Sequence, residues 1–92
     1  MTVVESERFK VRLKTITYLI KEDKQSVAVK FAKDLKINIR NLNNSPYKYR
    51  KSFYFNDDNI RDMTFKGYTI VYKIDMISDL IIVADIFNRN KP

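Results

Sequence analysis

The first half of the chain has the hydrophobic pattern of two amphipathic helices. Apolar residues recur every three or four positions and therefore share one face of a helix. In the first helix they are Phe9, Leu13, Ile16 and Ile20, and in the second Ala28, Phe31, Ala32, Leu35, Ile39 and Leu42. Ser6 is placed to cap the first helix, and Asp23 or Ser26 the second. Only the polar residues 21–24 separate the two patterns, which predicts an antiparallel helical hairpin that ends before Pro46.

The second half of the chain has the alternating pattern of strands. Residues 60–65 and 68–75 flank Lys66 and the only glycine, Gly67, and predict a β-hairpin because its two-residue loop needs positive φ. Residues 80–87 are apolar on both faces, which predicts a strand near the sheet centre. Residues 2–4 predict a short first strand, and residues 47–55 alternate in part.

The order of these elements predicts one α+β domain spanning residues 1–92. A short N-terminal strand and an antiparallel helical hairpin come first, and three strands follow, in the order β-α-α-β-β-β. We expect the helices to pack on one face of an antiparallel β-sheet.

Composition excludes several functional classes. The chain has no cysteine, which excludes disulfides and cysteine-bound zinc, and no histidine, which removes the commonest general base. A single glycine excludes the phosphate-binding loops that need several. Asp57, Asp58 and Asp62 could hold magnesium, but an exposed turn explains them better. We therefore expect no metal, no cofactor and no membrane span. A cytoplasmic location is expected from the absence of cysteine and of a signal peptide.

Charge is concentrated in the N-terminal part of the chain. The net charge is +7, and residues 1–53 carry 13 Lys/Arg against 5 Asp/Glu while residues 54–92 carry 5 against 6. Such asymmetry favours a polyanion or an acidic protein as partner, although a solvated lysine-rich surface would look the same.

Four basic residues stand out as candidates for target binding: Arg50, Lys51, Arg61 and Arg89. Residues 47–54 mix cations with aromatic rings, as in single-stranded nucleic-acid sites or at a protected sheet edge. Arg61 lies on a predicted strand and could project from the sheet, or form an ion pair with Asp62, Asp75 or Asp85. Arg89 and Lys91 follow the last strand and could join Arg61 at one surface.

Several motifs, taken in order, resemble the RelE/ParE superfamily of toxins from bacterial type II toxin–antitoxin modules. Ala28-Val-Lys-Phe-Ala-Lys-Asp-Leu35 occupies the second helix, which ends in Leu42-Asn-Asn-Ser-Pro46. The strands contribute Ile60-Arg61-Asp62, Gly67-Tyr-Thr-Ile-Val-Tyr72 and Ile82-Val-Ala-Asp-Ile-Phe-Asn88. The resemblance covers nearly the whole chain and implies a cognate antitoxin that forms a hetero-oligomer with the toxin.

The resemblance implies two possible activities. RelE-like members are ribosome-dependent mRNA endoribonucleases, and here Arg61, Arg89, Lys91 and Tyr68 would be the catalytic residues. ParE-like members inhibit DNA gyrase and have no known catalytic residues. Thr69 stands where the nucleases commonly have arginine, and no histidine is present, so no residue is an obvious proton donor or acceptor. We therefore favour a non-enzymatic, ParE-like gyrase inhibitor; the ribosome and mRNA are the alternative target, and an inactive, degenerate toxin is a further alternative.

Overall fold

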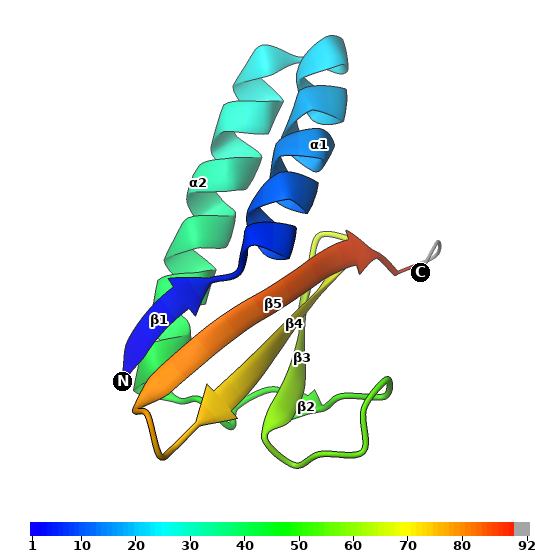
Figure 1. Cartoon of the computed structure of the whole chain (residues 1–92). Coiled ribbons are helices and arrows are strands. Elements are labelled where there is room, and N and C mark those ends of the chain that lie inside the picture. Colours follow the sequence, from blue (N-terminus) through cyan, green and yellow to red (C-terminus); the bar gives the residue numbers. More distant parts are fainter. Residues whose placement is uncertain (90–92) are drawn as a thin grey trace.

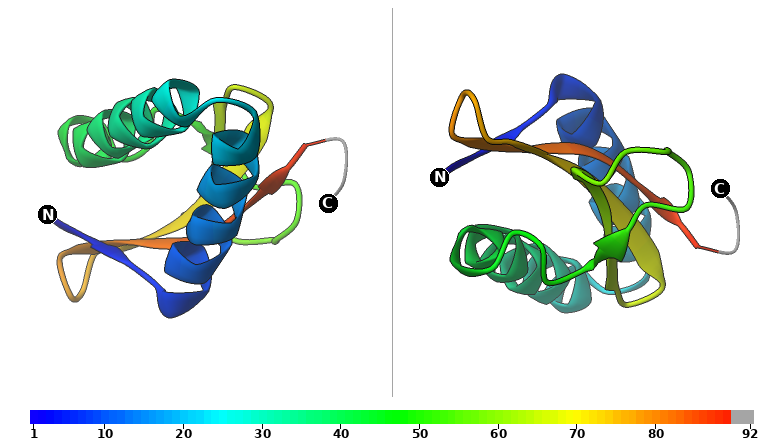
Figure 2. Two further views of the ribbon diagram at one scale, coloured as in Figure 1. Left: turned by 90° about the horizontal axis from the view of Figure 1, so that it is seen from above. Right: turned by 90° about the horizontal axis from the view of Figure 1, so that it is seen from below.

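A helical hairpin packs on one side of a five-stranded sheet in the computed structural model, which describes residues 1–89 (Figure 1). The elements in chain order are β1 (Thr2–Glu5), α1 (Glu7–Asp23), α2 (Gln25–Asn41), the short 3-10 helix η1 (Leu42–Asn44), β2 (Arg50–Lys51), β3 (Ile60–Phe65), β4 (Tyr68–Asp75) and β5 (Leu80–Asn88). Figure 2 shows α2 over one face of the sheet and α1 alongside β5, starting at the sheet edge that β1 forms. Among the described residues, no helix is both long and apolar enough to cross a bilayer.

The sheet has the strand order β1-β5-β4-β3-β2. The predicted α+β class and element order are confirmed, with one difference from the expected antiparallel sheet. β1 pairs parallel with β5, whereas the other neighbouring strands are antiparallel. The parallel direction lets β1 lead straight into α1, whose cap residue Ser6 continues the ladder by donating its N–H to Val83 O at 2.9 Å. β5 has a neighbour on both sides and lies next to the central strand β4, so the predicted place near the sheet centre is confirmed.

The helical hairpin forms where the apolar pattern predicts it, with a different second cap. The Ser6 hydroxyl accepts from Phe9 N at 3.1 Å and caps α1 as expected. The N-cap of α2 is Lys24, without a side-chain cap, rather than Asp23 or Ser26. The connection is the single extended residue Lys24, so Asp23 ends α1 and Ser26 already lies inside α2. Lys24 is also the C-cap of α1: its backbone N–H donates to Ile20 O, so the last turn of α1 is capped by the main chain and not by a side chain.

The predicted β-hairpin is confirmed with its boundaries. Lys66 and Gly67 have φ values of 46° and 84°, as a tight hairpin turn between right-twisted strands requires. The preceding segment is less regular than its alternation suggests, because β2 contains only Arg50 and Lys51. After these residues, side chains replace the strand ladder: Phe53 N donates to Asp62 Oδ2 at 3.2 Å, and Tyr54 N to the Ser52 hydroxyl at 3.2 Å.

The main core lies between the helical hairpin and the inner face of the sheet, defined here as the face that α1 and α2 cover. Phe9 and Leu35 are fully buried on the helix side, and Ile70 and Tyr72 on the sheet side. Several strand residues complete this core, namely Met63, Ile74, Ile81, Val83 and Ile86. The opposite, outer face of the sheet is partly covered by the loop between β2 and β3.

Ser6 is the residue we expect to be most important for joining the helices to the sheet. Its hydroxyl donates to Ala84 O at 2.7 Å while it accepts from Phe9 N, so one side chain caps α1 and ties it to β5. Ser6→Ala should lower the free energy of unfolding by about 1–2 kcal/mol in urea titrations. Ser6→Thr, which keeps a hydroxyl, should lose much less; equal losses would show that the cap is unimportant.

Candidate functional site

Arg61 fixes the loop between η1 and β3 to the sheet. It pairs with Tyr72 across β3 and β4, so both side chains start on the inner face. Its Nε donates to Asp58 O at 2.8 Å and its Nη1 to Tyr49 O at 3.1 Å. The guanidinium also lies 4.9 Å from the centre of the Tyr47 ring. These contacts hold both ends of the loop with one cationic side chain.

The partners of Arg61 differ from the ion pairs considered in the sequence. Within the described residues it forms no ion pair with Asp62, Asp75 or Asp85; its hydrogen bonds go to main-chain carbonyl oxygens. The reason is register: Arg61 and Asp62 are adjacent on β3, so their side chains point to opposite faces. Arg61 therefore holds the loop in place through main-chain carbonyl oxygens rather than through a carboxylate.

Tyr72 secures the other side of this loop. The ring is fully buried, and its hydroxyl donates to Pro46 O at 2.6 Å. Burial raises the pKa of Tyr72 to about 12, against a smaller lowering effect of the Arg61 charge. At neutral pH, Tyr72 is thus a protonated structural group and is poorly suited to proton transfer.

Raised pH should selectively remove the stabilisation that Tyr72 provides. The folded-state pKa of Tyr72 is above its usual value of 10. The stabilisation from Tyr72 is therefore fully present below pH 10 and is lost as the pH rises towards 12. Tyr72→Phe should be about 1 kcal/mol less stable than the parent at pH 7. Between pH 10 and 12 this difference in unfolding free energy should shrink or reverse, because only the parent carries Tyr72. The lysines are the same in both proteins, so their titration does not contribute to the difference. A constant difference in unfolding free energy would contradict the assignment.

Arg50 and Lys51 form an exposed cationic surface on β2. The Arg50 guanidinium stacks 3.6 Å from the centre of the Phe53 ring, and its Nη2 lies 3.7 Å from Asp62 Oδ2. Lys51 Nζ lies 3.3 Å from Asp58 Oδ1. Both side chains remain more than 40% exposed, so the predicted mixture of cations and rings is available to a partner.

Arg89 and Tyr68 lie at the opposite end of the β-hairpin from Arg61. Arg89 N donates to Gly67 O at 2.9 Å, beside the hairpin turn, and the Tyr68 ring packs 5.5 Å from Phe31. Arg61 pairs with Tyr72, four residues along β4 from Tyr68, or about 13 Å at strand spacing. The structure therefore does not bring Arg61 together with Arg89 and Tyr68. Lys91, the fourth candidate, lies outside the described residues.

The acidic turn before β3 makes local contacts. Asp57 Oδ1 accepts from Asn59 N at 2.8 Å, Asp58 pairs with Lys51, and the Asp62 side chain is buried beneath the loop. No cluster of three acidic side chains within residues 1–89 could hold a metal ion. Asp57 and Asp58 are thus explained by the turn that they stabilise.

A groove between α1 and α2 is the feature that the sequence analysis missed. Two adjoining hollows, of about 410 and 380 Å³, share Lys14, Thr17 and Ala32 and so form one continuous crease. Its remaining lining comes from both helices and the end of β1: Glu5, Glu7, Lys10, Val11, Leu13, Tyr18, Lys21, Gln25, Ala28, Val29 and Lys36. The small residues of α2, at four-residue spacing, could have indicated this shallow floor.

The free charges along this crease are basic. Lys10 pairs with Glu7 at 3.5 Å, and Lys36 pairs with Glu5. Lys14 and Lys21 form no ion pair with any residue in the described range. The crease thus offers apolar contact from Val11, Val29 and Tyr18 beside unneutralised ammonium groups, which suits an acidic amphipathic helix.

Comparison with known proteins identifies the family. The family described as "ParE toxin of type II toxin-antitoxin system, parDE" matches residues 3–91. The fold is similar to a solved chain titled "Chromosomal ParDE TA system from P. aeruginosa", with a TM-score of 0.75 and 12% identity over 96% of this chain and 95% of that one. The search of curated proteins found no match. Because the match covers nearly the whole of this chain, the chain belongs to the ParE toxins of type II toxin–antitoxin systems.

Proposed function

We propose that the protein acts in the cytoplasm as an inhibitor of DNA gyrase and that a cognate antitoxin neutralises it. Membership of the ParE toxin family supports a type II toxin, and the separation of Arg61 from Arg89 and Tyr68 is the observation that favours gyrase over the ribosome. A nuclease site needs a proton acceptor, a proton donor and cations around one phosphate. Here Arg61 is held by loop carbonyls, and its nearest cross-strand tyrosine is buried.

The exposed cations of β2 are the proposed contacts with the gyrase complex. Arg50 and Lys51 form β2, directly after the residues Pro46 and Tyr49, to which Tyr72 and Arg61 are hydrogen-bonded. A surface held in its binding conformation loses little entropy on association. Arg89 would contribute a second basic contact at the far end of the hairpin.

The crease is the proposed binding site of the antitoxin. An acidic amphipathic helix would place its apolar face on Val11, Ala32 and Val29, and its carboxylates beside Lys14 and Lys21. The toxin and antitoxin would then form the hetero-oligomer expected of a type II module.

Expression of the chain in bacteria without an antitoxin tests this function. Gyrase inhibition predicts an early block in DNA replication, with DNA-damage signalling, while protein synthesis continues. A prompt fall in translation with mRNA cut at codons would instead establish the ribosome as the target. Harmless expression of soluble protein that still binds its antitoxin would identify an inactive toxin.

A further inference from the structure

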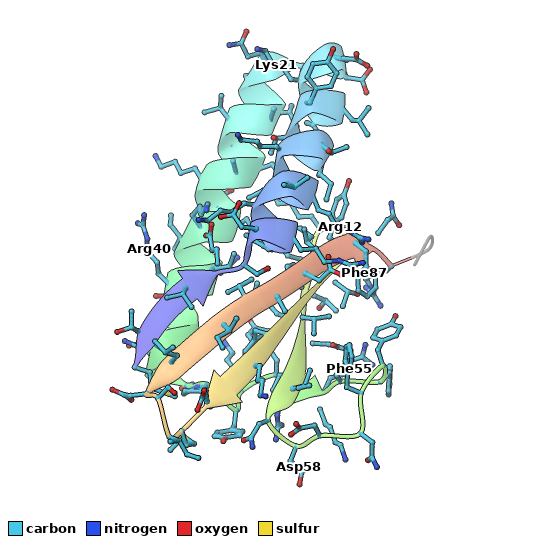
Figure 3. All side chains as sticks on the ribbon, viewed as in Figure 1. Arg12, Lys21, Arg40, Phe55, Asp58 and Phe87 are labelled. Atoms are coloured by element: carbon cyan, nitrogen blue, oxygen red, sulfur yellow. The ribbon has the colours of Figure 1, made fainter. Side chains whose placement is uncertain are left out.

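The outer face of the sheet contains a cavity outside both surfaces described above. It has a volume of about 470 Å³ and is hereafter called the outer cavity. Its lining residues come from α1, from the loop after β2, and from β4 and β5: Arg8, Arg12, Tyr54, Phe55, Val71, Ala84, Asp85 and Phe87. In Figure 3, Arg12 on α1 and Phe87 on β5 lie near each other, with Phe55 on the loop below them.

A β-bulge decides which side chains of β5 line this cavity. Val71 pairs with Asp85 and Tyr72 with Val83, which leaves Ala84 as an extra residue in β5. The extra residue shifts the alternation, so that Val83 and Ile86 both enter the core while Asp85 points to the outer face. Without the bulge, the Asp85 carboxylate would be buried among apolar residues, at a large cost in desolvation.

Two arginines share the carboxylate that the bulge exposes. Arg8 Nε lies 3.2 Å from one oxygen of Asp85, and Arg12 Nε lies 3.4 Å from the other. They reach the outer face because β1 pairs only with residues 80–83, which leaves the rest of that edge to the start of α1. Ser6 anchors this start to Ala84 O. Within the described residues no second carboxylate pairs with either guanidinium, so the site carries an excess positive charge.

The rest of the outer cavity is apolar and held in place. Val71, Ala84 and Phe87 line it from the sheet, and the Tyr54 ring packs edge-on against Phe87 at 5.2 Å. Phe55 is 51% exposed at the rim. The loop that carries both rings is bonded to the sheet through Phe53 N and Asp62. The cavity is therefore preformed, within the size range of pockets that accept one bulky group.

We propose that the outer cavity receives a bulky apolar side chain of the target protein, with an adjacent acidic residue bound by Arg8 and Arg12. Apart from the Tyr54 hydroxyl, the lining offers no uncharged polar side chain to read a nucleotide base, whereas an apolar group beside a carboxylate matches both parts of the site. The crease is already suited to the antitoxin, and this cavity lies on another face. The inference rests on the proposed function, with gyrase as the target.

Binding of the purified full-length chain to purified gyrase tests this inference. Two variants remove separate parts of the site: Phe55→Ser deletes the exposed ring, and Arg8→Gln with Arg12→Gln deletes the cations. Each should raise the dissociation constant at least about tenfold. Leu19→Ser, another exposed apolar residue, and Lys24→Gln with Lys33→Gln are the matched controls, and they should stay within about twofold. Circular dichroism and urea titration verify that each variant is folded, and antitoxin binding is measured separately.

The other outcomes separate the two proposals. If the parent chain binds gyrase and the cavity variants bind equally well, the inference is wrong and the proposed function stands. If the parent chain does not bind gyrase, both fail. Loss of antitoxin binding by folded Phe55→Ser would assign the cavity to the antitoxin. Binding of a single-stranded oligonucleotide that depends on Arg8 and Arg12 would assign it to nucleic acid. Either result would overturn the proposal.

Discussion

Arg61→Ala should lower the free energy of unfolding by about 2–3 kcal/mol and loosen the loop between η1 and β3. The substitution removes two charge-assisted hydrogen bonds, to Asp58 O and Tyr49 O, together with the stacking on Tyr47. The two carbonyl oxygens then have only solvent as a partner. Urea titration measures the loss of stability, and amide hydrogen exchange across residues 47–59 should show faster exchange there than in α1 and α2.

Two control variants separate charge from geometry at this position. Arg61→Lys keeps the charge but cannot make both hydrogen bonds at once from a fixed planar group, so it should lose much of the same stability. Lys73→Ala, an exposed position on β4, should change stability by less than 0.5 kcal/mol. If Arg61→Ala unfolds at the parent urea concentration, the structural assignment is wrong and a direct functional contact becomes the better explanation.

This role changes how loss of toxicity in Arg61 variants is to be understood. A loosened loop would move Arg50 and Lys51, so activity could fall without any direct contact between Arg61 and a target. Variants of Arg50 or Lys51 avoid this problem because both side chains are largely exposed. They are the cleaner test of target binding at this surface.

Lys14→Glu with Lys21→Glu should weaken binding of the antitoxin about a hundredfold or more. Both lysines line the crease, and neither is neutralised by a described residue. Charge reversal turns two attractions to an acidic helix into two repulsions in a partly desolvated interface. Isothermal titration calorimetry with the purified antitoxin gives the dissociation constant, and co-expression in bacteria should show toxicity that the antitoxin no longer suppresses.

The matched control reverses two lysines outside the crease. Lys24→Glu with Lys33→Glu changes the net charge by the same amount and should weaken binding by less than about fivefold, through long-range charge alone. Equal weakening by both pairs would mean that total charge decides the affinity. Unchanged binding in the Lys14 and Lys21 variant would remove the crease from the antitoxin interface.

The fold was largely predictable because hydrophobic periodicity reports burial directly. The stripe from Phe9 to Ile20 and the alternation around Gly67 each depend on residues close in sequence, and both appear in the structure. The cap of α2 was not predictable from propensity, because two good capping residues flank Lys24 and the one-residue connection leaves neither at the cap. β2 is short because side-chain bonds from Asp62 and Ser52 take over from the ladder.

The arrangement of candidate site residues depended on features that a single sequence hides. Register places Arg61 and Tyr68 at opposite ends of the hairpin, although seven positions separate them in the chain. The bulge at Ala84 turns Asp85 outward, and no residue type marks it in advance. The crease and the outer cavity both arise where distant segments meet. Charge asymmetry indicated a basic surface but could not distinguish these two sites.

Supercoiling of DNA by purified gyrase tests the central claim most directly. Added in increasing amounts to gyrase, relaxed plasmid and ATP, the full-length chain should block supercoiling, and the purified antitoxin should restore it. A reconstituted translation reaction, given the same amounts of the chain, should continue unaffected. Unimpaired supercoiling together with cleavage of ribosome-bound mRNA would contradict the account and establish a RelE-type activity for this ParE family member.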